Sequence, residues 1–222
     1  MESPQAGRQT KFMSFSGIDG AGKTTQITVF CARMRRSGLR VRLVTFWDDV
    51  AQLTSIRESA GHKLFNGDKG VGSPNAPINR RDKNVRSWPM SCLRLFLYFL
   101  DTVSVRKLFR ESMASDADLV VFDRYIYDEL ANLNLSNPLI KLYVRLIMNF
   151  VPRPQISFLL DADPVQARAR KPEYPLDFLC ANRQSYLTLN KLVPGMTVVP
   201  PMPVHDVTEE ILRQAERKLS LS

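Results

Sequence analysis

The apolar positions of the first fifty residues follow two different spacings in turn. Residues 11–16 are mostly apolar and predict a short buried strand. From Thr24 onward, apolar residues fall at i, i+3, i+4 and i+7, which is one face of a helix that Gly38 would end. Residues 40–47 alternate and are rich in β-branched and aromatic side chains, which predicts a second strand. This part of the chain therefore predicts a strand, a helix and a strand.

A similar succession follows residue 89. Apolar residues occur on most faces of a helix over 92–112, so we expect that helix to be largely buried. The continuous apolar run in 117–125 is typical of a central parallel strand that is covered on both faces. Asn137 and Pro138 suit the N-cap and first position of a helix ending near Phe150. That helix is apolar nearly all round, which fits either a core or a subunit interface.

The last third of the chain adds two strands, at 155–163 and 196–200, and an amphipathic helix over 206–219. Strands that alternate with helices indicate a parallel, doubly wound sheet with helices on both faces. At 222 residues, the chain is expected to form one α/β domain spanning 1–222.

Periodicity fades in the segment 48–89. The segment is dense in glycine, proline, asparagine and charge, so we predict a long basic loop or lid, with at most a short helix at 52–63. Two interpretations stay open. The basic stretch 80–86 closes over a binding cleft and supplies anion contacts, or the segment is a surface loop.

Composition narrows the class of protein. The longest apolar run, 95–100, is far shorter than the roughly 20 residues that cross a bilayer. The first residues lack a secretory pattern, so we expect a cytoplasmic protein with no membrane partner. Three widely spaced cysteines argue against a disulfide framework or a zinc site. The net charge of +9 favours nucleotides, nucleic acid or phosphorylated metabolites as partners.

A phosphate-binding motif connects the first strand to the first helix. The spacing G-x-x-x-x-G-K-[ST] is met by Gly17, Gly22, Lys23 and Thr24. Glycines let backbone N–H groups turn toward phosphate oxygens, the lysine reaches the β- and γ-phosphates, and the threonine ligates Mg²⁺. The predicted ATP-binding residues are Gly17, Asp19, Gly20, Ala21, Gly22, Lys23, Thr24 and Thr25. A chance match in a flexible glycine-rich turn is the alternative, and the flanking strand and helix disfavour it.

The sequence FDRY ends the predicted strand at 117–125. Ligands of open α/β sheets bind beyond the carboxyl ends of the strands, so Asp123 is expected near the phosphates and Mg²⁺, with Arg124 beside it. A structural ion pair between these two residues is the alternative interpretation.

Together, GIDGAGKTTQ at 17–26, DRY at 123–125 and LLDADP at 159–164 resemble the thymidylate kinase family of nucleoside monophosphate kinases. The resemblance covers about 11–47 and 90–219. It implies a five-stranded parallel sheet of the P-loop type, ATP with Mg²⁺ as donor, a deoxynucleoside monophosphate as acceptor, and usually a homodimer. It also places the acceptor near Asp19, Arg124 and Tyr125, with the arginine on the acceptor's phosphate.

The cation that completes phosphoryl transfer has to come from outside the P-loop, because residues 19–21 offer none. The sequence ARARKPEY stands where the family has its closing lid, about 166–176, and supplies Arg168 and Arg170. With Lys23 and Asp123, these are the predicted catalytic residues. A solvated basic helix end is the alternative.

Departures from the family lie where the acceptor is read. Residues 45–49 are TFWDD instead of the usual Arg-Glu-Pro, and Thr102 stands where a base-contacting arginine is expected. Asp128 and Glu129 replace small hydroxyl residues after DRY. We therefore expect weaker discrimination among pyrimidine monophosphates than the family shows.

Other classes fit less well. A regulatory GTPase needs N-K-x-D, but 190–193 reads NKLV. A nucleic-acid-binding P-loop protein suits the charge and the stretch 80–88, yet leaves Asp123 and Arg124 unexplained. A kinase of the same fold with another phosphorylated or hydroxyl-bearing acceptor stays open.

Overall fold

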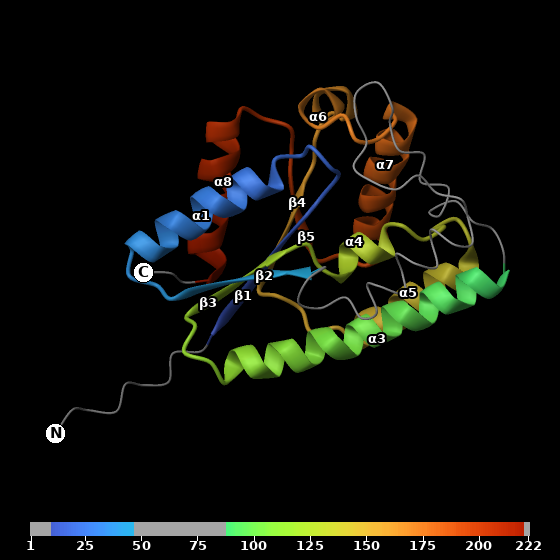
Figure 1. Ribbon diagram of the computed structural model, residues 1–222, viewed down its shortest axis with the longest axis horizontal. Helices are drawn as coiled ribbons and strands as arrows, with labels where there is room; N and C mark the ends of the chain where they lie inside the picture. Colours follow the sequence, from blue (N-terminus) through green and yellow to red (C-terminus); the bar gives the residue numbers. More distant parts are fainter. Residues whose placement is uncertain (1–9, 47–87, 220–222) are drawn as a thin grey trace.

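The computed structural model describes residues 10–46 and 88–219, and within 88–94 only the backbone. In this part of the chain, five parallel strands form one sheet in the order β2-β3-β1-β4-β5 (Figure 1). The strands are β1 (Lys11–Ser16), β2 (Val41–Thr45), β3 (Leu119–Asp123), β4 (Ile156–Leu160) and β5 (Met196–Val199). The predicted α/β fold with a parallel sheet is confirmed.

Helices cover both faces of the sheet (Figure 1). They are α1 (Lys23–Arg36), α3 (Trp88–Met113), α4 (Ile126–Leu130), α5 (Pro138–Phe150), α6 (Pro164–Arg170), α7 (Leu176–Leu192) and α8 (Val204–Leu219). One core contains buried side chains of α1 and α8, including Phe30 and Ile211. The other core contains buried side chains of α3, α4, α5 and α7, including Phe109 and Leu189. The fold is therefore doubly wound, as expected.

The central strand β1 sets the position of the site. Successive residues Phe12 and Met13 enter opposite cores, so the strand is apolar on both faces. Phe15 lies opposite Asp123 in the β1–β3 ladder and opposite Phe158 in the β1–β4 ladder. The carboxyl ends of three strands are thus level with one another, and the P-loop begins directly beside the end of β3.

Most predicted boundaries agree with the structure within a few residues. Asn137 caps α5, accepting a hydrogen bond from the Leu139 N–H at 2.9 Å. The predicted strand at 40–47 is shorter, and α3 and α8 begin earlier than expected. Helices α4, α6 and α7 were not predicted, because α4 and α6 are very short and the buried residues of α7 are sparse.

The predicted loop or lid at 48–89 and its short helix at 52–63 lie almost entirely outside the described residues. The same holds for the basic stretch 80–86. No helix within 10–46 and 88–219 has the length and apolar character needed to cross a membrane.

Candidate active site

The P-loop is held against two other parts of the chain. Gly17 has a φ of 142°, and a Cβ placed there would lie 2.5 Å from the Leu160 carbonyl oxygen at the end of β4. Gly20 has a φ of 80°, and its Cβ would lie 2.2 Å from the Ala167 carbonyl oxygen in α6. Both glycines are therefore required by backbone conformation and by close approach. The loop is fitted between β4 and the helix of the predicted short lid.

Lys23 folds back over this loop. Its Nζ donates hydrogen bonds to the carbonyl oxygens of Gly17 at 2.6 Å and Ile18 at 2.9 Å. Burial and, less strongly, the charge of Arg124 lower the pKa of Lys23, nearby carboxylates raise it, and the net result is a pKa of about 8. A buried ammonium on the phosphate-binding loop is suited to an anionic ligand, because the ligand's charge would replace the solvation that burial removes.

Arg124 occupies a strained turn after β3. Its φ of 70° is in the left-handed region, and its N–H donates to the Phe15 carbonyl at 3.0 Å. Non-glycine residues in this region are uncommon and often found at functional sites. The turn directs the guanidinium to Asp19 of the P-loop, with Nη2 and Oδ1 2.5 Å apart. The alternative interpretation was an ion pair between Arg124 and the adjacent Asp123, whereas the carboxylate that pairs with this arginine in the structure is Asp19.

Asp19 stays ionised in this position. Burial raises its pKa, but the positive charges of Arg124 and Lys23 outweigh burial, and the net effect is a pKa below the ordinary value. Asp123 shows the opposite balance, because burial raises its pKa more than the same two cations lower it. Two carboxylates and two cations thus meet at the carboxyl ends of β1 and β3.

The oxygen ligands available near the P-loop suit Mg²⁺. Thr24 is exposed at the first turn of α1, and Asp123 is half-buried at the end of β3. Among the described residues, no cluster of three or more histidine, cysteine or acidic side chains could hold a metal ion by itself. Mg²⁺ keeps several waters and is usually held by one or two protein oxygens together with substrate phosphates. A hydroxyl and a single carboxylate therefore fit a nucleotide-bound Mg²⁺.

The predicted lid cations lie on α6, next to the P-loop. Asp163 caps this helix by accepting hydrogen bonds from the N–H groups of Val165 and Gln166. Arg170 is exposed, and its Nη1 donates to the Gly20 carbonyl at 3.1 Å. Arg168 is half-buried on the same helix. The structure thus brings Arg170 to the loop, as the position of the lid in the sequence predicted.

Tyr125 is a correction to the predicted acceptor site. The residue is 0% exposed, and its hydroxyl donates to the Pro152 carbonyl at 2.5 Å. Its ring packs edge-on against Phe122, with the centroids 5.2 Å apart. The left-handed turn at Arg124 separates the two neighbours, so the arginine faces the P-loop while the tyrosine enters the core.

Three of the residues that depart from the family are also buried, while most of the departing stretch 45–49 lies outside the described residues. Thr102 donates its hydroxyl to the Tyr98 carbonyl one turn earlier in α3, at 3.0 Å. Asp128 and Glu129 are each 3% exposed in α4. Asp128 lies behind Arg124, with a carboxylate oxygen 3.8 Å from Nη1. Sequence reasoning placed these three residues around the acceptor base, and the structure makes Asp128 a buried partner of the arginine.

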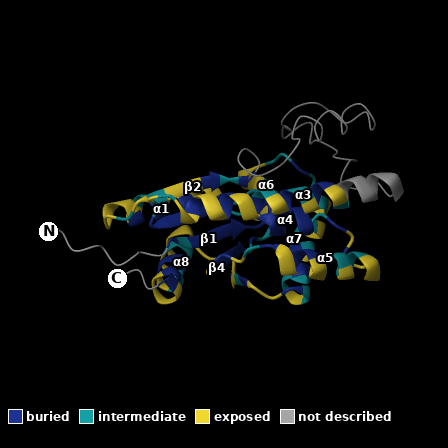
Figure 2. Cartoon of the chain, turned by 90° about the horizontal axis from the view of Figure 1, so that it is seen from below, coloured by how far each residue is buried: buried dark blue, intermediate teal, exposed yellow. Residues whose placement is uncertain are grey.

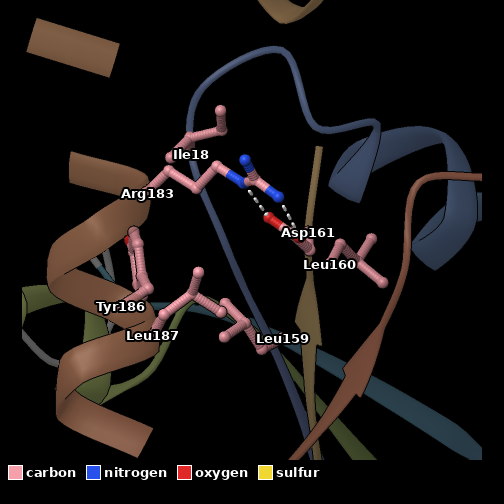
Figure 3. A pocket seen from close by; sticks show the side chains of 7 residues that line it. All are labelled: Ile18, Leu159, Leu160, Asp161, Arg183, Tyr186 and Leu187. Carbon is pink, nitrogen blue, oxygen red and sulfur yellow. Dashed lines mark hydrogen bonds and ion pairs between the residues drawn. The ribbon is translucent and has the colours of Figure 1, made fainter. Parts of the chain in front are cut away.

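A second ion pair near the site was not predicted. Arg183 of α7 makes a bidentate pair with Asp161 after β4, through Nε at 2.6 Å and Nη2 at 2.7 Å (Figure 3). The pair borders a small pocket lined by Ile18, Leu159, Leu160, Asp161, Arg183, Tyr186 and Leu187. The pair joins α7 to the carboxyl end of β4, on the same side of the sheet as the P-loop. In the sequence, Asp161 of LLDADP was the available sign of an ion pair at this position, but its partner Arg183 is 22 residues further along the chain.

No family model matches the chain. Among curated proteins, it is 26% identical to a probable thymidylate kinase of Pyrococcus abyssi, over 94% of this chain and 97% of that one. It is 21% identical to a probable thymidylate kinase of Methanosphaera stadtmanae, over 91% of this chain and 95% of that one. These alignments span nearly the full length of both partners.

Solved structures have the same fold. The thymidylate kinase of Ehrlichia chaffeensis superposes with a TM-score of 0.56 at 20% identity, covering 94% of this chain and 99% of the other. That of Candida albicans gives 0.61 at 15% identity, with 94% and 92% covered. Taken with the P-loop and the Asp-Arg-Tyr turn, the near full-length relatives support the resemblance of this chain to the thymidylate kinase family, as a divergent member.

Proposed function

We propose that the protein transfers the γ-phosphoryl group of ATP to a deoxynucleoside monophosphate, with thymidylate as the first acceptor to test. The observation that carries this proposal is the pair between Asp19 and Arg124, 2.5 Å apart, which joins the P-loop to the turn after β3. A donor loop and an arginine outside that loop, both at one end of the sheet, suit two phosphorylated ligands. The curated relatives named above are described as probable thymidylate kinases, which supports the same conclusion.

The donor side uses the P-loop. Lys23 would exchange the Gly17 and Ile18 carbonyls for the β- and γ-phosphates of ATP. Thr24 and Asp123 would hold Mg²⁺, which neutralises charge on the phosphate oxygens when bound. Backbone N–H groups of the loop and of the first turn of α1 add donors to the same oxygens.

The acceptor side uses Arg124 and Asp19. A guanidinium binds a phosphate through two parallel hydrogen bonds, so Arg124 suits the acceptor's phosphate. Asp19, with its lowered pKa, stays an acceptor for a sugar hydroxyl. The acceptor's phosphate would compete with Asp19 for the same guanidinium, and this exchange would free the carboxylate for the sugar.

The lid side uses α6. Arg170 contacts the Gly20 carbonyl, so its guanidinium would be the nearer of the two lid cations to the transferred group. Arg168 lies half a turn earlier and therefore on the opposite side of α6, so it would reach the transferred group only if the lid moves. Positive charge there would stabilise the charge that spreads over the oxygens in the transition state.

A second candidate is a kinase of the same fold with a different phosphorylated acceptor. The buried Thr102 favours it, because this hydroxyl is bonded within α3 and no arginine stands at that position to read a base. A second phosphate-bearing ligand would still suit Arg124.

We further propose that two copies of the chain associate through α3 and α5. Exposed positions recur along both helices (Figure 2). The exposed apolar side chains at helical spacing include Phe96, Phe99 and Val103 on α3, and Leu139, Leu142, Leu146 and Phe150 on α5. Light scattering of the wild type should give a molar mass of twice that of one chain. The Leu142→Glu variant should give the mass of a single chain. The matched control is Val29→Glu, since Val29 is an exposed apolar residue of α1, and this variant should stay dimeric.

The test of the activity is an ATP-consumption panel over all nucleoside and deoxynucleoside monophosphates, with acceptor-free hydrolysis as the control. Lys23→Ala should keep the fold and lower transfer by at least about 10², because such electrostatic contacts contribute several kcal/mol. Near-normal turnover in that variant would contradict the kinase assignment. Consumption only with a phosphorylated non-nucleotide acceptor would favour the second candidate.

A further inference from the structure

A buried carboxylate joins three parts of the site. Asp128 is 3% exposed, and within the described residues its side-chain oxygens accept three hydrogen bonds. Oδ2 accepts from the Ser16 hydroxyl at 2.6 Å and from the Tyr125 N–H at 3.0 Å. Oδ1 accepts from the Tyr186 hydroxyl at 2.7 Å. The donors come from the end of β1, from the turn after β3, and from α7.

The same carboxylate acts on Arg124 in two ways. By accepting the Tyr125 N–H, it fixes the peptide that follows the left-handed arginine. Its Oδ1 also lies 3.8 Å from Nη1 of that arginine, while Asp19 holds Nη2 at 2.5 Å. The guanidinium is thus fixed between a carboxylate on the P-loop side and a carboxylate on the core side.

The electrostatics support a charged role for this residue. A buried carboxylate is costly unless it is hydrogen-bonded and paired with a cation, and Asp128 is both. Burial together with the charge of Asp128 raises the pKa of Tyr186 well above its ordinary value, so the tyrosine remains a hydrogen-bond donor. Tyr186 also lines the pocket beside the Asp161–Arg183 pair, which places the contact between α4 and α7 next to the P-loop (Figure 3).

We propose that Asp128 is a positioning residue that orients the Arg124 guanidinium for the acceptor's phosphate and, through Tyr186, ties this orientation to α7. The proposal rests on the proposed function. A residue that only packs the core would lower stability without a preference for one substrate. A residue that orients Arg124 acts selectively on the acceptor, since ATP is held by the P-loop.

The primary variant is Asp128→Asn, which keeps the shape and removes the charge. The amide oxygen can still accept from Ser16 and Tyr125, and the Tyr186 hydroxyl can turn to accept from the amide N–H. We expect the acceptor KM to rise about tenfold or more, because the loss of an interaction with a charged group weakens binding by roughly this factor. The ATP KM should change by less than about twofold, because ATP is held by the P-loop. In an Arg124→Lys background the same substitution should have less than about a threefold effect, because the fork that it orients is gone.

Tyr186→Phe is the second variant and removes one donor while keeping the ring. It should raise the acceptor KM in the same direction by about threefold or more. If Asp128→Asn fails to fold, the Tyr186→Phe variant tests the positioning role in its place. The matched control is Asp118→Asn, since Asp118 is 7% exposed and pairs with Arg40 through Nε at 3.1 Å, at the opposite end of β3. This control should lose stability and keep both KM values.

Equal changes in both KM values, or full additivity with Arg124→Lys, would overturn the positioning role. Calorimetric titration of thymidylate without ATP separates this failure from failure of the kinase assignment. Binding that weakens in Asp128→Asn without any turnover in the wild type would contradict the kinase activity alone. Turnover and binding that are unchanged in both variants would contradict the positioning role alone. If the wild type does not bind thymidylate, the titration is repeated with the other acceptors of the ATP-consumption panel, and binding of none of them would contradict both.

Discussion

Lys23 is expected to make the stability of the folded chain depend on alkaline pH. The residue is 7% exposed, and burial lowers its pKa from 10.5 to about 8. In the unfolded chain the pKa returns to 10.5. The difference of about 2.5 corresponds to about 3 kcal/mol, at 1.36 kcal/mol for each pKa unit.

The direction follows from which state binds the proton. Below about pH 8 both states are protonated, so the full cost of burying the ammonium is present. Between about pH 8 and 10.5 the unfolded chain holds a proton that the folded chain lacks, so the free energy of unfolding rises with pH. Above that window neither state is protonated, and the cost is gone.

A Lys23→Met variant lacks the titrating group and keeps the length of the side chain. Urea unfolding of both proteins at several pH values from about 7 to 10.5 gives the free energy of unfolding of each. The variant's free energy is then subtracted from that of the wild type at each pH. This difference should grow by about 3 kcal/mol in favour of the wild type as the pH rises, while other tyrosines and lysines cancel. A difference that stays constant within about 0.5 kcal/mol would refute the assignment of a lowered pKa to Lys23.

Three further predictions concern the acceptor arginine, the lid and the P-loop. Arg124→Lys should raise the acceptor KM much more than the ATP KM. In the wild type, kcat/KM should be similar for thymidylate, deoxyuridylate and deoxycytidylate, and strong selectivity for thymidylate would contradict weak discrimination of the base. Alanine at Arg168 or Arg170 should lower kcat more than it weakens ATP binding, and wild-type kcat in both single variants and the double variant would remove the lid role. Gly20→Ala should lower the urea midpoint more than Gly38→Ala, because both have positive φ but only the Cβ at Gly20 meets backbone; equal losses would argue against the close approach.

Local patterns predicted the fold and the position of the P-loop between β1 and α1. The strand ends, the glycines and Lys23 lie within one continuous stretch, and the N-cap at Asn137 is read from two adjacent residues. These features depend on short-range spacing, which sequence alone contains.

The acceptor side could not be predicted in the same way. The bond from Ser16 to Asp128 joins positions 112 residues apart, and that from Tyr186 to Asp128 joins positions 58 apart. Tyr125 was assigned to the site by its adjacency to Arg124, and the left-handed turn sends the two side chains in different directions. Which carboxylate pairs with which cation depends on these long-range contacts.

The sheet order has a consequence for how the chain folds. Of the five described strands, the earliest in the chain is the central one, and both of its neighbours in the sheet come much later, with Lys11 opposite Leu119 and Met13 opposite Ile156. Pairings of such long sequence separation close large loops and slow the search for the native state. A nascent chain that ends before β4 therefore carries the whole phosphate-binding motif but lacks the backbone against which Gly17 packs. If the P-loop binds ATP as proposed, nucleotide binding during synthesis should begin only after β4 has emerged, and ATP would then report that β1 and β4 have paired.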